Sequence, residues 1–121
     1  MALLHTAHVP AGEGPFPTIV ALHGWGASAH DLLGLAPVLH GGGALVLCPQ
    51  GPVAFQIAQG MLGFGWWPIT QSREIDPREF GRARDVLRKF LDDALARYPI
   101  DRRKLVMMGF SQGGVMAYDL V

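Results

Sequence analysis

The sequence predicts an α/β fold with a mainly parallel β-sheet. Short apolar runs alternate with helix patterns along the 121 residues, and this alternation is typical of parallel strands joined by helices. Half of the residues are apolar and 17% are charged, a balance that predicts a folded chain. No repeat, low-complexity tract or internal boundary is visible, and the length suits one domain.

The first half of the chain contains three expected strands. Residues 3–9 predict a short strand, and residues 10–17 a loop rich in glycine and proline. Residues 18–22 (TIVAL) and 44–48 (ALVLC) are compact apolar runs bounded by glycine or proline. Such runs indicate strands that are buried on both faces of a sheet.

A helix is expected between the second and third strands. Ser28 followed by Asp31 matches a capping box, with the Asp31 carboxylate used at the cap. The helix should run to about His40 and end at the three glycines that follow.

The second half predicts a long loop, a helix, a strand and a second helix. Residues 53–78 lack a clean period and are interpreted as an aromatic-rich loop. Asp76-Pro77 opens a strongly amphipathic helix that stops before Pro99. Residues 104–109 (KLVMMG) predict a buried strand, and a helix should begin at Gln112.

The segment Gly109-Phe110-Ser111-Gln112-Gly113 fits the pattern G-x-S-x-G. An apolar strand runs into it and a helix pattern runs out, which is the context in which this pattern exposes a nucleophilic serine on a strained turn. The flanking glycines give the strand and helix room to approach each other. Ser111 should therefore stand at the carboxyl end of a strand, where open α/β sheets bind ligands. The alternative is a glycine-rich turn with an idle serine.

A second glycine-bearing loop, His23-Gly24-Trp25-Gly26, directly follows the strand at 18–22. Acyl transfer needs preorganised donors for the oxyanion. The expected donors are the backbone N–H groups of Gln112, after the serine, and of Trp25, in this loop. His23 is expected to shape the loop rather than act as the base, because the base follows the serine in triads of this kind.

These segments together resemble one family. "IVALHGWGASAHDLLGLAPVL", "LVLCPQGP", "GFGWWPI" and "KLVMMGFSQGGVMA" are similar, in order and spacing, to the phospholipase/carboxylesterase family of α/β-hydrolases, which includes acyl-protein thioesterases. The resemblance runs from about residue 17 to the last residue and implies an α/β-hydrolase fold. It implies that Ser111 is the nucleophile that cleaves carboxylic esters or acyl thioesters, with Trp25 and Gln112 as oxyanion donors. It also suggests that Trp66 and Trp67 line an acyl pocket, although a tryptophan pair serves equally often as a packing anchor.

The family's triad places an Asp and a His after the serine, and this chain has no histidine after Ser111. Its single later acid, Asp119, lies roughly 12 Å along the outgoing helix and is expected to be a surface residue. We therefore expect the chain to be the N-terminal part of a single α/β-hydrolase domain (1–121), truncated after the nucleophile turn and inactive alone. The strand at 104–109 would then be an exposed sheet edge open to self-association.

Composition and charge exclude several other classes. The ten basic and ten acidic residues give zero net charge, which argues against a nucleic-acid partner. No apolar stretch is long enough to span a membrane, and no signal peptide is visible. The one cysteine, Cys48, excludes an internal disulfide and is expected to be buried, in keeping with a cytoplasmic protein. We expect neither cofactor nor metal.

Two other functions stay open. The chain could be a non-catalytic module that pairs with a partner through its sheet edge. Within the α/β-hydrolases, a dienelactone-hydrolase-like or peptidase-like enzyme is the runner-up, although the former would favour a cysteine at position 111.

Overall fold

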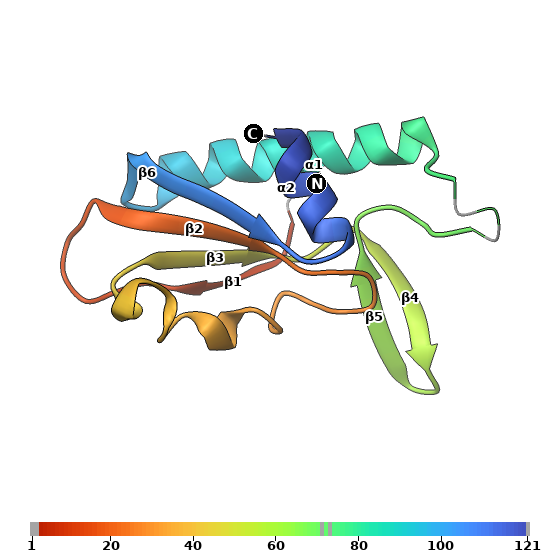
Figure 1. Cartoon of the computed structure of the whole chain (residues 1–121), viewed down its shortest axis with the longest axis horizontal. Helices are drawn as coiled ribbons and strands as arrows, with labels where there is room; N and C mark the ends of the chain where they lie inside the picture. The colour runs from red at the N-terminus through yellow and green to blue at the C-terminus, as the bar shows by residue number, and fades with distance from the viewer. Residues whose placement is uncertain (1–2, 71, 73, 121) are drawn as a thin grey trace.

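The computed structural model of the protein describes residues 3–70, 72 and 74–120. Its main sheet has four strands in the order β1-β3-β2-β6 (Figure 1). β2 and β6 both run parallel to their neighbours, whereas β1 pairs antiparallel with β3. The strands span His5–His8 (β1), Phe16–Leu22 (β2), Leu45–Pro49 (β3) and Ile100–Gly109 (β6). The predicted α/β class with a mainly parallel sheet is confirmed.

Two helices, α1 (Pro77–Arg97) and α2 (Gln112–Leu120), cover one face of this sheet (Figure 1). The Oδ1 atom of Asp76 accepts a hydrogen bond from the backbone N–H of Arg78 at 2.9 Å, and Pro77 takes the first helical position, as predicted. Spacings of three and four residues direct one side of α1 into the core. Its buried residues are Ala83, Leu87, Phe90 and Ala94.

The opposite face is covered by turns and two short 3-10 helices instead of the helix expected over residues 28–40. These are η1 (Leu33–Leu35) and η2 (Leu39–Gly42). The prediction was wrong because Pro37 supplies no N–H to an α-helix and the chain enters the left-handed region at His40, where φ is 51°. The proposed cap does form, since Asp31 Oδ2 accepts the backbone N–H of Ser28 at 2.6 Å.

Residues 53–65 also differ from expectation, because most of the predicted loop is an antiparallel hairpin. β4 (Val53–Ala58) and β5 (Met61–Gly65) form a second, two-stranded sheet that projects away from the first (Figure 1). The hairpin is attached to the loop after β2. Gly26 N–H donates to Phe64 O, and Phe64 N–H donates to Ala27 O, each at 2.9 Å.

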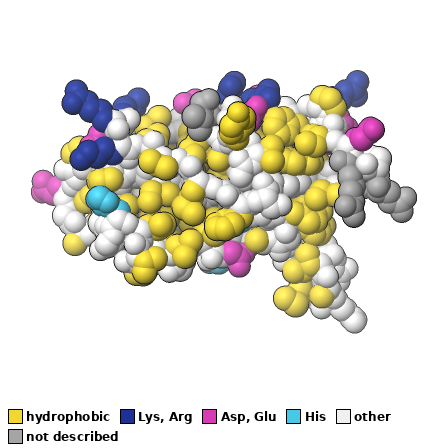
Figure 2. All heavy atoms as spheres, viewed as in Figure 1, with side chains coloured by type: hydrophobic (Ala, Val, Ile, Leu, Met, Phe, Trp, Pro, Cys, Tyr) yellow, Lys and Arg dark blue, Asp and Glu magenta, His cyan; other side chains and the backbone are white. Residues whose placement is uncertain are grey.

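The edge position expected for the last strand is confirmed, since β6 ends the strand order. The strand expected over residues 104–109 starts earlier, at Ile100, and its burial was predicted wrongly. Its residues are half-buried or exposed, because no further strand among the described residues pairs with its outer edge. Figure 2 shows hydrophobic side chains gathered on the face where β6 lies. Among the apolar residues exposed on β6 and α2 are Val106, which is 58% exposed, Val115 and Tyr118. In the part of the chain that is described, no helix combines the length and apolar character needed to cross a membrane.

Candidate active site

Ser111 occupies the turn between β6 and α2 and has a φ of +53°. A non-glycine residue rarely adopts this left-handed conformation, and such strain collects at functional sites. The strained strand-to-helix turn is the geometry typical of an exposed nucleophilic serine. The serine is solvent-exposed at the carboxyl end of β6.

The glycines around this turn allow backbone segments to touch. A Cβ atom on Gly109 would overlap the backbone of Gly113, and one on Gly113 would overlap the carbonyl of Leu22. Strand β2, strand β6 and helix α2 thus meet at distances that no side chain permits, which confirms the predicted need for room at both glycines.

The loop after β2 runs directly beside Ser111. A Cβ atom on Gly24 would lie 3.1 Å from the Phe110 carbonyl oxygen and 3.3 Å from the Ser111 Cβ atom. Over the described residues, neither the backbone N–H of Trp25 nor that of Gln112 donates a hydrogen bond. The structure therefore brings the two expected donors to adjoining segments and leaves both unused.

His23 lies under this loop and is 2% exposed. Its Nε2 atom accepts the backbone N–H of Gly51 at 2.9 Å, so the proton must sit on Nδ1, which donates to the Gly24 carbonyl at 2.8 Å. Burial lowers the pKa of His23, although the Gly24 hydrogen bond and the charge of Asp31 oppose the shift. With both nitrogens occupied, His23 fixes the loop, as predicted, and has no free nitrogen for a serine proton.

The side chain of Gln112 was not anticipated as part of the site. It is 4% exposed, and its Oε1 atom accepts the backbone N–H of Trp66 at 2.8 Å. Its Nε2 atom donates to the Trp67 carbonyl at 2.9 Å. A glutamine at the inward-facing start of a helix was the available signal, because a buried amide needs partners.

The sequence and fold comparisons agree with this geometry. A family model described as Phospholipase/Carboxylesterase matches residues 5–121. The chain belongs to this family. No curated protein matches the sequence significantly.

Solved structures of esterases share the fold. Esterase PE8 has 26% identity and a TM-score of 0.79, over 98% of this chain and 56% of its own. The Bacillus cereus carboxylesterase has 29% identity and a TM-score of 0.76, over 98% of this chain and 52% of its own. A carboxylesterase from Mesorhizobium loti, at 18% identity and a TM-score of 0.74, supports the fold alone. The α/β-hydrolase fold is thereby shown, and the chain spans about half the length of these structures.

Trp66 and Trp67 lie in the core of this family member, where they are 1% and 6% exposed. The indole Nε1–H of Trp66 donates to the His23 carbonyl at 2.9 Å, and the Trp67 ring packs against Phe80 with centroids 5.3 Å apart. These contacts favour the packing interpretation of the pair. Contact with an acyl group stays a prediction.

No triad partner for Ser111 is assembled within the described residues. Asp119 accepts two hydrogen bonds from Arg84, at 2.7 and 3.0 Å, which lower the pKa of its carboxyl, so it joins α2 to α1. No histidine of the described chain forms a hydrogen bond with Ser111. In those residues no cluster of three His, Cys, Asp or Glu side chains could hold a metal ion.

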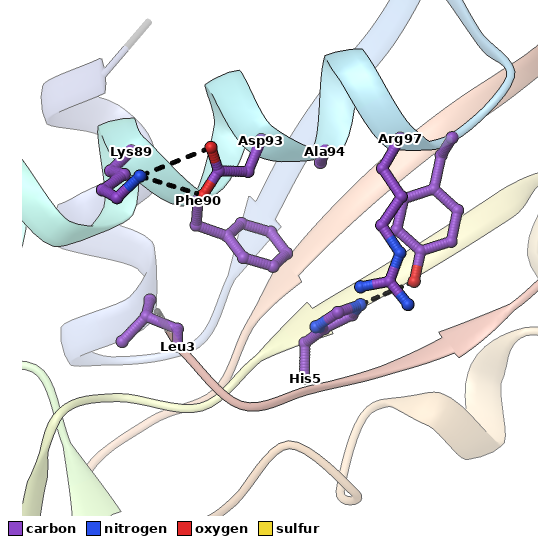
Figure 3. Close-up of a pocket in the computed structure, with 8 residues that line it drawn as sticks. Leu3, His5, Lys89, Phe90, Asp93, Ala94 and Arg97 are labelled. Atoms are coloured by element: carbon purple, nitrogen blue, oxygen red, sulfur yellow. Dashed lines mark hydrogen bonds and ion pairs between the residues drawn. The ribbon is translucent and has the colours of Figure 1, made fainter. Parts of the chain in front are cut away.

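A separate cavity of about 90 Å³ lies between β1 and α1 (Figure 3). His5 Nε2 and the Tyr98 hydroxyl are 2.6 Å apart across it, and the Arg97 guanidinium lies 5.3 Å from the centroid of the Tyr98 ring. Burial and the Arg97 charge lower the pKa of His5. None of the residues that line this cavity belongs to the segments around Ser111, so it is not part of the candidate active site.

Proposed function

We propose that this chain supplies the nucleophile and the oxyanion donors of a serine hydrolase that cleaves carboxylic esters or acyl thioesters. The observation that carries the proposal is the strained, exposed Ser111 beside the backbone N–H groups of Trp25 and Gln112, which donate to no acceptor among the described residues. The family membership and the esterase neighbours support the same reaction class.

In the proposed reaction, the Ser111 Oγ attacks the carbonyl carbon of the substrate while its proton passes to a base, which later gives it to the leaving group. The carbonyl oxygen becomes an oxyanion that the N–H groups of Trp25 and Gln112 stabilise. The C–O or C–S bond then breaks, the alcohol or thiol leaves with a proton, and the acyl group stays on Ser111 until water hydrolyses it. We also propose that Trp66 and Trp67 contact the acyl group.

Serine attack requires a base, and His23 has no free nitrogen to act as one. We therefore propose that the base and its orienting acid lie outside these 121 residues, with the chain forming the N-terminal part of a single hydrolase domain. The span of about half of each esterase neighbour supports this. Turnover by the chain alone should be negligible.

A cytoplasmic location is proposed for the chain from its one, buried cysteine.

Hydrolysis of p-nitrophenyl butyrate tests both parts of the proposal. Wild type and Ser111→Ala should hydrolyse it equally slowly without an added base. With imidazole as an external base, the hydrolysis rate of wild type should exceed that of Ser111→Ala. The rate with Ser111→Ala measures the reaction of imidazole itself with the ester. Equal rates with imidazole would refute serine chemistry. Robust turnover without imidazole, lost in Ser111→Ala, would refute the absence of an internal base.

A second candidate is self-association through β6, favoured by its place at the sheet edge and the 58% exposure of Val106. Light scattering over a concentration series should then show a dimer that Val106→Lys converts to monomer, because edge charges oppose strand pairing. A wild-type chain that stays monomeric throughout would exclude this candidate.

A further inference from the structure

The side-chain amide of Gln112 pairs with the backbone of the segment that follows the β4–β5 hairpin. Its oxygen accepts from Trp66 N–H at 2.8 Å and its nitrogen donates to the Trp67 carbonyl at 2.9 Å. The oxygen and the nitrogen of the Gln112 amide are thus each bonded to the main chain of one of two consecutive residues. Two such bonds fix the direction of the amide plane as well as its position.

The backbone N–H of the same residue is the expected oxyanion donor. Gln112 is the first residue of α2, where a helical N–H has no acceptor within the helix. The N–H and the side chain leave the same residue, so a side chain held at two points restricts the rotation that would turn the N–H away. Preorganised donors stabilise an oxyanion best, because they need no reorganisation during the reaction.

The segment that holds Gln112 is itself fixed to the loop that carries the other expected donor. Trp66 Nε1–H donates to the His23 carbonyl at 2.9 Å. The Trp25 ring stacks on Phe55 of β4, with centroids 3.9 Å apart and ring planes 12° apart. On its way to Trp66, the chain passes so close to Trp25 that a Cβ atom on Gly65 would overlap the indole ring. Residues 53–67 therefore contact both donor residues.

We propose that the Gln112 side chain is a positioning residue, which holds the Gln112 backbone N–H in place for the oxyanion by pairing with Trp66 and Trp67. The proposal rests on the proposed serine chemistry, because a positioned N–H matters only if an oxyanion forms there. It assigns the side chain a role separate from that of the backbone group of the same residue.

Two substitutions separate positioning from simple packing. Gln112→Met keeps the length of the side chain and removes both hydrogen bonds. Gln112→Glu restores them when its carboxyl is protonated, because C=O can accept from Trp66 N–H and O–H can donate to the Trp67 carbonyl. The ionised carboxylate only accepts, so it would face the Trp67 carbonyl without a proton between them. Burial raises the pKa of such a carboxyl, which brings its titration toward neutral pH.

Thr18→Val provides a matched control. Thr18 is 1% exposed, and its hydroxyl donates to the Phe16 carbonyl at 3.0 Å, near the start of β2. The substitution removes one buried hydrogen bond while keeping the shape of the side chain, at the end of the strand away from the Ser111 turn. Any effect that follows from lost stability alone should appear in this variant as well.

The experiment measures the initial rate at which Ser111 is acetylated by p-nitrophenyl acetate in the presence of imidazole, with the Ser111 peptide quantified by mass spectrometry. Gln112→Met should acetylate at least ~10-fold more slowly than wild type, a smaller effect than the ~10²–10³-fold loss found when an oxyanion donor is removed outright, because the backbone N–H is still present. Gln112→Glu should be equally slow at high pH, and its rate relative to wild type should recover as the pH falls. Thr18→Val should match wild type.

Two results would overturn the proposal, and they are distinguishable. If wild type acetylates at Ser111 and folded Gln112→Met and Gln112→Glu do so at the wild-type rate at every pH, the positioning role is wrong while the serine chemistry stands. If wild type is not acetylated at Ser111, the serine chemistry fails and the positioning role fails with it. Circular dichroism establishes that each variant is folded.

Discussion

The surroundings of Ser111 and the cavity between β1 and α1 each contain a histidine whose pKa burial lowers, yet they are built differently. Around Ser111, backbone meets backbone, and His23 is bonded to two main-chain groups of neighbouring loops. Around the cavity, side chains meet side chains, and His5 reaches the Tyr98 hydroxyl beside about 90 Å³ of space. The comparison indicates that the geometry of the candidate site depends on close backbone contacts, which tolerate substitution least.

The largest expected effect comes from adding one methyl group where backbones touch. Gly113→Ala places a Cβ atom against the Leu22 carbonyl, which neither β2 nor α2 can relieve without moving. We expect a loss of about 4 kcal/mol or more in the free energy of unfolding, at the far end of the range for point substitutions. Urea denaturation of both proteins measures it.

Gly81→Ala is the matched control. Gly81 lies in α1, and a Cβ atom there would meet nothing within 4 Å. The alanine should raise the free energy of unfolding by about 0.5–1 kcal/mol through its better helix propensity. Equal effects of the two substitutions would contradict the distinction between closed and open surroundings.

Replacing either of the two histidines should have the next largest effect on the free energy of unfolding. His23→Phe leaves the Gly51 N–H and the Gly24 carbonyl without their partner, at a cost of about 1–3 kcal/mol for each buried group. His5→Phe removes the hydrogen bond to the hydroxyl of Tyr98, a half-buried residue, so the expected loss is about 1 kcal/mol or less. The denaturant midpoint should therefore be lower for His23→Phe than for His5→Phe. The reverse order would show that His23 does not hold the loop.

The smallest expected effect is on the pH dependence of stability. Both histidines have a lowered pKa in the folded state, so below about pH 6.5 the unfolded chain binds more protons than the folded chain. The two histidines therefore make their full contribution to the free energy of unfolding above that pH. This contribution is lost as the pH falls toward their pKa values in the folded state. Both His23→Phe and His5→Phe should reduce this decline, because each removes a group whose pKa is lowered by folding. A free energy of unfolding that rises as the pH drops from 7 to 5.5 would contradict the assigned directions.

Sequence patterns predicted the elements whose determinants are local. The Asp76-Pro77 start and the three- and four-residue spacing fixed α1, and compact apolar runs marked β2, β3 and the second half of β6. The expected helix over residues 28–40 failed because Pro37 and the left-handed His40 outweigh a good capping box. The β4–β5 hairpin was missed because glycines interrupt β5, although Val53, Phe55 and Ile57 already alternate with smaller or polar residues on β4.

The sequence predicted the individual residues of the candidate site, but not the hydrogen bonds that connect them. The G-x-S-x-G pattern and the glycine-bearing loop after β2 located Ser111 and the two expected donors. The bonds from Gln112 to Trp66 and Trp67 join residues 46 and 45 positions apart, respectively. The bond from Gly51 to His23 spans 28 positions. No local pattern specifies such long-range pairs, which arise only when the hairpin packs against the end of the sheet.

The central claim is that this fold presents Ser111 as an acyl acceptor, and peptide mass spectrometry after exposure to p-nitrophenyl acetate and imidazole tests it most directly. We predict that a single acetyl group forms on the peptide that contains Ser111 and is absent from Ser111→Ala. The serines at 28 and 72 of the same sample should remain unmodified under those conditions. Acetylation spread equally over the three serines, or none at position 111, would contradict the account.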